Sequence, residues 1–496
     1  MSGAKRLAAA PTAVAGLEPI LMSIVQCLAS PQDVLAFLHG LDTPSLCTPL
    51  AALLQLLRAP RWAISTYPSS DDYCLSYLWP CLSLDDVQPA AAAVVVDAMP
   101  MFPKMEVDDV GKWMREWTFV PPGRLPSDGR FDAFAWLAAT WGHKLTLIGI
   151  GDEVDDDGRA IEPTLDLPVL CSALKLCKGL NEVSVLSDNL IVPDIFAAVT
   201  TPAHHVRRVR VHSSLPETDC AAALQPWLAS GHAEHLDFSY FNEAEEVNGS
   251  VCLLLAAAHT LTSLHLVLDP TPPLDDVDGP WLENLSELRI TSYRAEQRFI
   301  ERLLHSTRLM SLSISASFDF GVVLDVLPRF PALYELNLAS CAFDAINVAP
   351  GTWQGTPALR SVGIGDAQWF SDAALDALMA LLAGAPALET VSLSECEWSD
   401  RQFDVVASSL RNCIDRGVRH ISVMSCFYLD LSDNHDIDTA GKYALLDALA
   451  TCAGVSVQLD SHLAPSSTEA AARNLMVLVK NPYFVVASPA CDASAV

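Results

Sequence analysis

Apolar residues recur along the chain in a fixed nine-residue frame. The stretch Leu333-Tyr-Glu-Leu336-Asn-Leu338-Ala-Ser-Cys341 places three leucines in the spacing L-x-x-L-x-L and a cysteine at the ninth position. The frame begins again at Leu261, Leu285, Leu309, Leu333, Leu359, Leu388 and Val418. The steps are 24, 24, 24, 26, 29 and 30 residues, and three identical steps in succession indicate an internal repeat.

Looser copies of the frame and helix-like stretches complete the pattern. The looser copies begin at Leu145, Leu180, Val206, Ala233 and, near the C-terminus, Cys452, which makes eleven to twelve units in all. Apolar residues at helical spacing follow several frames, as at Phe299, Ile300, Leu303 and Leu304. Ser371 reads as the start of such a helix and Ser399-Asp-Arg-Gln402 as a capping box.

A short strand plus a helix in each unit of 24 to 30 residues is typical of leucine-rich repeats. One unit cannot cover its own apolar face, so strands stack in parallel while helices cover the outside. We therefore predict an α/β fold, a leucine-rich-repeat solenoid shaped as a horseshoe. Cys341, Cys396 and Cys426 share the ninth frame position, where we expect each thiol to turn inward and donate to a neighbouring carbonyl.

Side chains between the frame residues are predicted to form the inner, concave face, because side chains alternate along a strand. The candidate partner-binding residues on this face are Arg207, Arg208, Arg210, His212, His235, His265, Arg289, Asn337, Arg360 and His420. The cluster Arg207 to His212 is basic in an acidic chain. Two interpretations stay open for it: a solvated face neutralised by neighbouring acids such as Glu234 and Asp237, or a patch for an acidic ligand.

The N-terminal residues show a different pattern. Ile20, Leu21, Ile24, Val25 and Leu28 share one helical face, and Ser30-Pro31 starts a second helix with Asp33 in its first turn. This run resembles the first half of the F-box over about forty residues. It departs from the family in the reversed order of Glu18-Pro19 and in its second half, where leucines between 46 and 57 replace a Val-Cys-x-x-Trp segment.

The resemblance implies that the N-terminal helices dock on a Skp-type adaptor of a cullin ubiquitin ligase. The positions that match the family's contacts are Ile20, Leu21, Pro31, Val34 and Leu35. A helical cap that only shields the first repeat is the alternative, because the ends of a solenoid must be covered.

These patterns divide the chain into five segments. We expect a disordered N-terminus at 1–15, the F-box-like helices at 16–60, a linker or irregular capping region at 61–140, leucine-rich repeats at 141–462, and a C-terminal cap and tail at 463–496.

The composition restricts the classes of partner and the cellular compartments that we expect. Among 496 residues, 30 Lys and Arg stand against 60 Asp and Glu, and a net charge of −30 disfavours nucleic acid and anionic membranes. The 14 cysteines form no Cys-x-x-Cys pair, so we expect reduced thiols in a cytoplasmic or nuclear protein. No stretch is apolar and long enough for a membrane span.

Two stretches of the sequence are candidate metal sites. The stretch Glu153 to Gly158 looks like the opening of a calcium loop, but Thr164 occupies the place of the closing glutamate. His232 and His235 sit at a strand entry, where their spacing points them to opposite faces. Phosphate-loop and nucleophile-elbow motifs are absent from the sequence. We expect no metal, no cofactor and no enzyme activity.

The function predicted from the sequence is protein binding, as the substrate-recognition subunit of a Skp–cullin–F-box ligase. The alternative is a free-standing scaffold or inhibitor that binds a protein without any link to a ligase.

Overall fold

The structure, a computed structural model, describes most of the chain. The described residues are 17–41, 46–59, 79–85, 87–116, 131–151, 166–186, 192–213, 217–241, 255–269, 282–292, 297–304, 308–341, 357–367, 371–396, 400–418, 420–424, 443, 446–447, 449–450, 456–459, 465–480 and 483–487. The chain forms two compact units. The first unit comprises Met1–Leu215 and Ala222–Ala233, and the second comprises Pro216–Ala221 and Glu234–Val496.

In the part of the chain that the structure describes, three helices precede the sheet of the first unit: α1 (Glu18–Cys27), α2 (Pro31–His39) and α3 (Thr48–Arg58). The helix start predicted at Ser30-Pro31 is confirmed, because the Ser30 side chain accepts a hydrogen bond from the Asp33 backbone N–H at 3.1 Å. The end of α1 is tied to the start of the sheet by Trp79, whose indole Nε1 donates to the Leu28 carbonyl at 2.7 Å.

Within its described residues, the sheet of the first unit contains five parallel strands, β1 (Cys81–Ser83), β2 (Lys104–Val107), β3 (Leu145–Gly151), β4 (Glu182–Leu186) and β5 (Arg208–Ser213), paired in chain order. Helices α4 (Ala92–Ala98), α5 (Val110–Glu116), α6 (Phe131–Trp141), α7 (Leu167–Leu174) and α8 (Val192–Val199) connect them, and α9 (Glu217–Leu228) follows β5. β1 and β2 lie within residues 61–140, whose fold the sequence left open. They extend the parallel sheet of frame strands toward the N-terminus.

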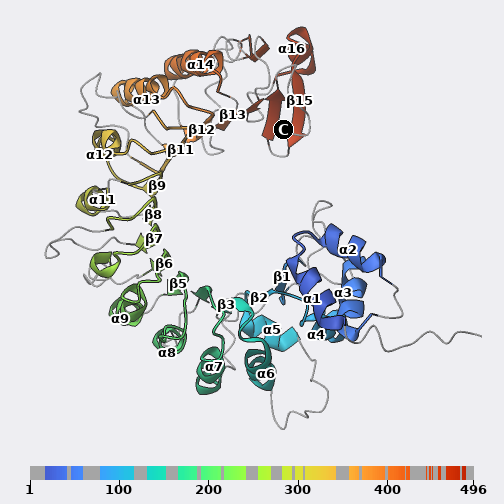
Figure 1. Cartoon of the computed structure of the whole chain (residues 1–496). Coiled ribbons are helices and arrows are strands. Elements are labelled where there is room, and N and C mark those ends of the chain that lie inside the picture. Colours follow the sequence, from blue (N-terminus) through green and yellow to red (C-terminus); the bar gives the residue numbers. More distant parts are fainter. Residues whose placement is uncertain are drawn as a thin grey trace, which may run out of the picture. The chain divides into compact units, whose positions relative to one another are not determined.

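The second unit continues the strand-and-helix pattern. Its strands β6 (His235–Phe241), β7 (Ser263–Asp269), β8 (Glu287–Ser292), β9 (Ser311–Ala316), β10 (Glu335–Ala339), β11 (Ser361–Ala367), β12 (Thr390–Cys396), β13 (His420–Met424) and β14 (Ser456–Leu459) pair in parallel, each with the next. Helices α11 (Gln297–Leu303), α12 (Phe320–Val326), α13 (Asp372–Gly384) and α14 (Asp400–Asp415) cover one side of this strand layer (Figure 1).

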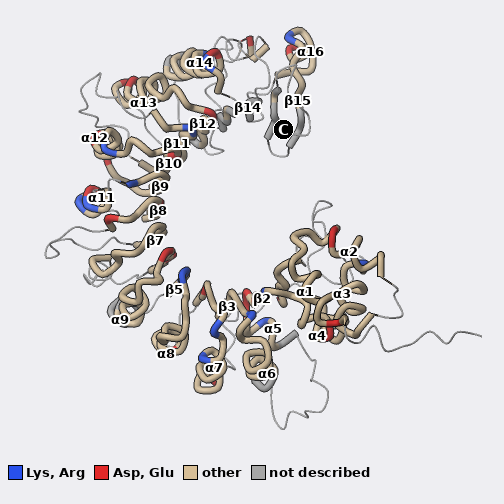
Figure 2. Tube along the Cα trace, in the orientation of Figure 1, with Lys and Arg blue, Asp and Glu red and all other residues tan. Residues whose placement is uncertain are grey.

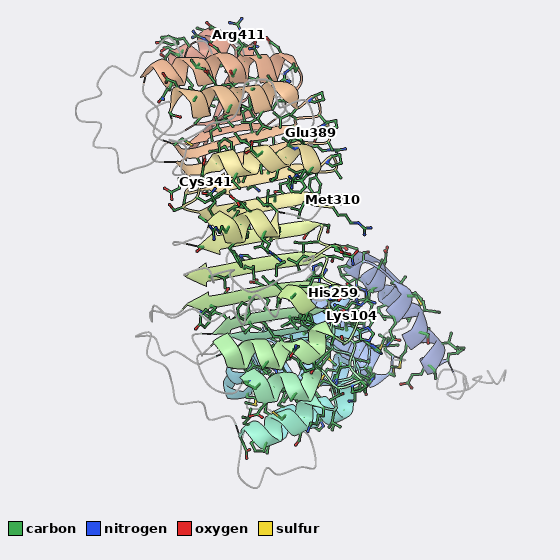
Figure 3. The ribbon with its side chains drawn as sticks, turned by 90° about the vertical axis from the view of Figure 1, so that its left-hand side faces the viewer. Lys104, His259, Met310, Cys341, Glu389 and Arg411 are labelled. Carbon is green, nitrogen blue, oxygen red and sulfur yellow. The ribbon has the colours of Figure 1, made fainter. Side chains whose placement is uncertain are left out.

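All strands of the parallel layer run in the same direction across the second unit. Met310 and Glu389, which precede β9 and β12, lie at one edge of the ribbon, and Cys341, which follows β10, lies at the other (Figure 3). After β14 the direction reverses: β16 (Tyr483–Ala487) pairs antiparallel with β14, and β15 (Met476–Lys480) pairs antiparallel with β16.

Burial and register confirm the frame. The first frame positions from Leu261 to Val418 are exposed by 5% at most. The fourth positions align across neighbouring strands, as in Leu264, Leu288, Leu312 and Leu336. The looser copies from Leu145 to Ala233 are buried in the same way. The predicted leucine-rich-repeat architecture is therefore present: stacked parallel strands with their frame residues in the core and helices outside. Ser371 caps α13 as predicted, accepting from Ala374 N–H at 3.1 Å. The capping box at Ser399 lies outside the described residues.

The ninth-position cysteines turn inward as predicted. The Cys396 thiol donates to the carbonyls of Ser394 at 3.4 Å and of Ile364, on the neighbouring strand, at 3.7 Å. The Cys341 thiol donates to the Ala339 carbonyl at 3.4 Å, and burial raises the pKa of this thiol. Both cysteines are buried, and neither forms a disulfide within the described residues, which suits a packing role. Cys426 lies outside the described residues.

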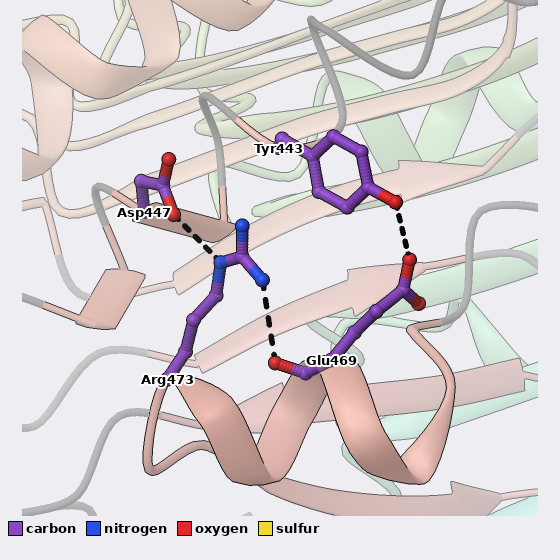
Figure 4. A network of polar contacts seen from close by, with 4 residues as sticks. All are labelled: Tyr443, Asp447, Glu469 and Arg473. Carbon is purple, nitrogen blue, oxygen red and sulfur yellow. Dashed lines mark hydrogen bonds and ion pairs between the residues drawn. The ribbon is translucent and has the colours of Figure 1, made fainter.

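A small polar network holds the C-terminal part of the second unit (Figure 4). Arg473, which follows α16 (Ser467–Ala472), contacts Asp447 at 2.6 Å through Nε and donates to the Glu469 carbonyl at 3.4 Å. The Tyr443 hydroxyl donates to the Glu469 carboxylate at 2.6 Å, and the Arg473 guanidinium lies 5.1 Å from the Tyr443 ring centre. These contacts join Tyr443 and Asp447 to α16 and to the residue that follows it. Within the described ranges, no helix has the length and apolar character that a bilayer crossing requires.

Candidate functional site

The strand face that is not covered by helices carries two rows of polar side chains in the second unit. Alternation along each strand turns leucine, isoleucine and valine into the core and leaves every second residue on this face. The first row, in strand order from β6, is His235, Ser263, Glu287, Ser311, Glu335, Ser361 and Thr390. The second row is Asp237, His265, Arg289, Ser313, Asn337, Gly363 and Ser392. Charged positions of both signs lie along this part of the layer (Figure 2).

A hollow of about 300 Å³ opens on this face over β7 to β10. It is lined by Ser263, Leu264, His265, Glu287, Leu288, Arg289, Ser311, Ser313, Tyr334, Glu335 and Asn337. The hollow forms because the side chains on this face differ in length from one strand to the next. β9 contributes only Ser311 and Ser313, whereas the strands on either side contribute long side chains such as Glu287 and Glu335. The serines form the floor and the longer side chains form the walls.

The wall on β10 is held in place by hydrogen bonds. Ser311 Oγ donates to Glu335 Oε2 at 3.0 Å, and Asn337 Nδ2 donates to Glu335 Oε1 at 3.0 Å. Gly363, next to Asn337 on β11, leaves room for this arrangement, because a Cβ at Gly363 would overlap Asn337 Oδ1. The Glu335 carboxylate therefore has a fixed orientation before any ligand arrives.

The wall on β8 carries charges of opposite sign. Glu287 and Arg289 stand two residues apart on the same face, and both are exposed. Within the part of the chain that the structure describes, neither side chain has a hydrogen-bond or ion-pair partner. Beside them, His265 Nδ1 lies 3.0 Å from Asp237 Oδ1. The hollow thus combines a fixed carboxylate, a free carboxylate and a free guanidinium.

The structure brings together three of the predicted concave-face residues, His265, Arg289 and Asn337, in the lining of the hollow. His235 lies in the first row, one strand beyond Ser263. Arg360 precedes β11 and pairs with Glu389 at 3.5 Å on an exposed edge. The backbone of His420 lies in β13, and its side chain is not among those described.

The predicted basic cluster lies in the first unit, where Arg207 precedes β5 and Arg208, Arg210 and His212 lie on it. Arg208 and Arg210 share one carboxylate, that of Glu182 on β4, at 4.0 and 3.4 Å, and their side chains are more than half exposed. Glu182 was not among the acids expected to neutralise the cluster. Parallel pairing of β4 with β5 places it beside Arg208. His232, considered with His235 as a metal pair, instead contacts His205, with Nε2 3.1 Å from His205 Nδ1. Among the described residues, no group of three metal-ligating side chains occurs. The stretch Glu153 to Gly158 lies outside them.

The N-terminal positions that match the F-box contacts differ in exposure. Ile20 on α1 is 55% exposed, and Leu21 is half-buried. On α2, Pro31 and Val34 are buried within the unit and Leu35 is half-buried. The exposed apolar surface of α1 consists of Leu17, Ile20 and Ile24, at 49%, 55% and 40%.

Tyr334 is the lining residue that the sequence did not single out. It directly precedes β10 and is partly exposed at the hollow. A bulky aromatic residue at the second frame position, where the neighbouring repeats carry Met310 and Arg360, is the signal that would have found it.

No protein-family model matches the chain, and no curated protein matches it. Among solved structures, the chain is similar to the functional domain of InlJ from Listeria monocytogenes, which includes a cysteine ladder, at 14% identity and a TM-score of 0.28, over 52% of this chain and 47% of that one. It is similar to TLR13 in complex with ssRNA13 at 12% identity and a TM-score of 0.28, over 65% and 58% of the two chains. It is similar to the APL1 leucine-rich repeat domain at 11% identity and a TM-score of 0.25, over 57% and 74%.

The matched stretch spans about half the length of the InlJ chain and less than two thirds of the TLR13 chain. All three are leucine-rich-repeat proteins. The repeat architecture of this chain rests on its own strand register and buried frame.

Proposed function

We propose that the chain is a non-catalytic protein-binding repeat protein that holds its partner on the polar strand face of the second unit. The observation that carries the proposal is the hollow over β7 to β10, where Glu287 and Arg289 on β8 are exposed across β9 from the fixed Glu335 carboxylate. Charged side chains that face a hollow and lack partners gain hydrogen bonds when a ligand supplies them. Solenoids commonly bind along such extended strand faces.

Filling the hollow tests this proposal. We expect Ser313→Trp to place an indole over the floor and to abolish binding of peptides selected on the full-length chain from a displayed library of random sequences. The matched control is Arg411→Trp, which adds the same side chain to the exposed surface of α14, on the helical side of the unit (Figure 3). The proposal fails if selected peptides bind the Ser313→Trp chain as well as the unaltered one, or if no peptide is enriched.

A finer proposal concerns the N-terminal helices: recognition of substrates for a Skp–cullin–F-box ligase. The F-box-like start of α2 and the exposed apolar stripe Leu17, Ile20 and Ile24 on α1 support it. Because Pro31 and Val34 are buried in the unit, the stripe on α1 is the surface that remains for an adaptor. A free-standing scaffold, in which α1 to α3 only cap the sheet, is the alternative.

Co-purification with a Skp-type adaptor separates these two. We expect Ile20→Asp with Ile24→Asp to abolish the association, because both changes put charge into an apolar contact. Ala36→Asp on the exposed side of α2 adds a charge to the same unit and serves as the control. An adaptor that never associates with the unaltered chain, or that associates equally with the double variant, would favour the free-standing scaffold.

A further inference from the structure

The hollow has a charge pattern that selects among protein partners. We infer that it receives a Lys or Arg side chain of the partner, held over Ser311 between the Glu287 and Glu335 carboxylates. This inference rests on the proposed function and names the chemistry that the strand face recognises.

The residues that line the hollow determine the sign of the charge that the ligand carries. Glu287 and Glu335 contribute two carboxylates, whereas Arg289 contributes the one permanent cation of the lining. His265, the remaining titratable group of the lining besides the Tyr334 phenol, already contacts the carboxylate of Asp237. A carboxylate ligand placed in the first row would be repelled from both sides, and a cation would be attracted from both sides. The net charge of −30 adds long-range attraction for a basic segment.

The spacing of the two carboxylates suits a cationic group. Parallel strands lie about 4.8 Å apart, so β8 and β10 hold Glu287 and Glu335 about 10 Å apart at their Cα atoms, with Ser311 between them. Side chains that lean inward from the two walls bring their carboxylates within reach of one ammonium or guanidinium group. Each Glu335 oxygen accepts one hydrogen bond already and has a second lone pair for a donor from the ligand.

The second row adds a requirement beside the cation. Arg289 points onto the same face two residues after Glu287, about 7 Å along the strand. Its guanidinium needs an acceptor, which a backbone carbonyl or a carboxylate of the partner supplies. The recognised feature is therefore a basic side chain followed closely by an acceptor, in a segment that lies across β8 to β10.

A peptide selection on the full-length chain tests the inference. We expect the peptides enriched from a random displayed library to carry Lys or Arg. A synthetic copy of the best peptide should lose affinity about tenfold or more when Arg is replaced by citrulline or Lys by norleucine, because a charge-assisted hydrogen bond is lost. Glu287→Gln with Glu335→Gln should weaken the unaltered peptide by a similar factor. Raising the salt from about 0.05 to about 0.5 M should weaken binding to the unaltered chain more than binding to this variant.

Glu389→Gln is the matched control, since Glu389 is an exposed acid at the edge of the same unit that pairs with Arg360 and does not line the hollow. The inference would be overturned, and the proposed function would stand, if the selected peptides lose binding with Ser313→Trp but carry no Lys or Arg. The same holds if these peptides bind the Glu287→Gln and Glu335→Gln double variant as well as the unaltered chain. Acidic peptides lost with Arg289→Ala would overturn it in favour of an anionic partner. Binding unaffected by Ser313→Trp would overturn both.

Discussion

Asp85 couples the stability of the first unit to pH. This residue follows β1, is 7% exposed, and accepts hydrogen bonds from the backbone N–H groups of Asp108 and Asp109. Burial raises the pKa of its carboxyl from 3.8 to about 7, although the two N–H donors act in the opposite direction. At about 1.4 kcal/mol for each tenfold change in proton affinity, this rise corresponds to about 4 kcal/mol.

The direction of the change in the free energy of unfolding with pH follows from proton uptake on folding. Between pH 3.8 and about 7 the folded unit holds a proton on Asp85 that the unfolded chain has released. The free energy of unfolding therefore decreases as pH rises through this window. The contribution is complete below the unfolded pKa and is lost above the folded one. A carboxamide does not titrate, so Asp85→Asn is expected to remove this pH dependence, with a total effect of up to about 4 kcal/mol.

Hydrogen exchange of the segment around Asp108 and Asp109, corrected for the intrinsic pH dependence of exchange, provides the assay. We expect protection in the unaltered chain to fall between about pH 4 and about pH 8 relative to Asp85→Asn. Asp97→Asn, at an exposed carboxylate on α4, is the control and should follow the unaltered chain. An equal pH dependence in the Asp85→Asn and unaltered chains would refute the reasoning.

Substitutions at three further positions test packing and the site. Gly363→Ala should displace the Asn337 amide and weaken peptide binding about threefold to tenfold, measured by calorimetry, while leaving far-UV circular dichroism unchanged. Leu312→Ala, at a fully buried frame position, should lower the free energy of unfolding of the second unit by about 2 to 5 kcal/mol in urea, and a loss under about 1 kcal/mol would contradict its core position. Arg473→Ala should lower the free energy of unfolding by about 1 to 2 kcal/mol and speed hydrogen exchange in β15. Arg473→Lys should recover only part of this loss, because the contact to Asp447 uses Nε. Equal hydrogen exchange in the two variants would argue against this geometry.

Much of the fold follows from the sequence because the frame residues have one physical role. From Leu261 to Val418, each first frame position is apolar and each is buried. The early strands escaped prediction because Cys81–Ser83 and Lys104–Val107 are too short to show a complete frame. They are strands because β3 offers a parallel edge to pair with, a tertiary effect that periodicity does not report.

The site was predictable only in part. Alternation placed His265, Arg289 and Asn337 on the correct face, and the structure adds that they share a hollow. Finding the hollow requires a comparison of side chains across the four strands β7 to β10, and that comparison requires the register. The contact between Ser311 and Glu335, 24 residues apart, shows that residues one repeat apart become neighbours. Likewise, Glu182 beside Arg208 could be found only after β4 and β5 were aligned.

The reversal of direction after β14 has a consequence for how copies of this protein meet. A parallel sheet that ends on an uncovered repeat strand offers its free backbone groups to the first strand of another molecule, which allows head-to-tail polymers. Here the last strand, β15, runs against β16, and Lys480 ends it. β16 runs antiparallel to β14 and already pairs with the edge of β14 on which a further parallel repeat would stack. The hairpin thus acts as a terminator that keeps the stacking of repeats within one molecule.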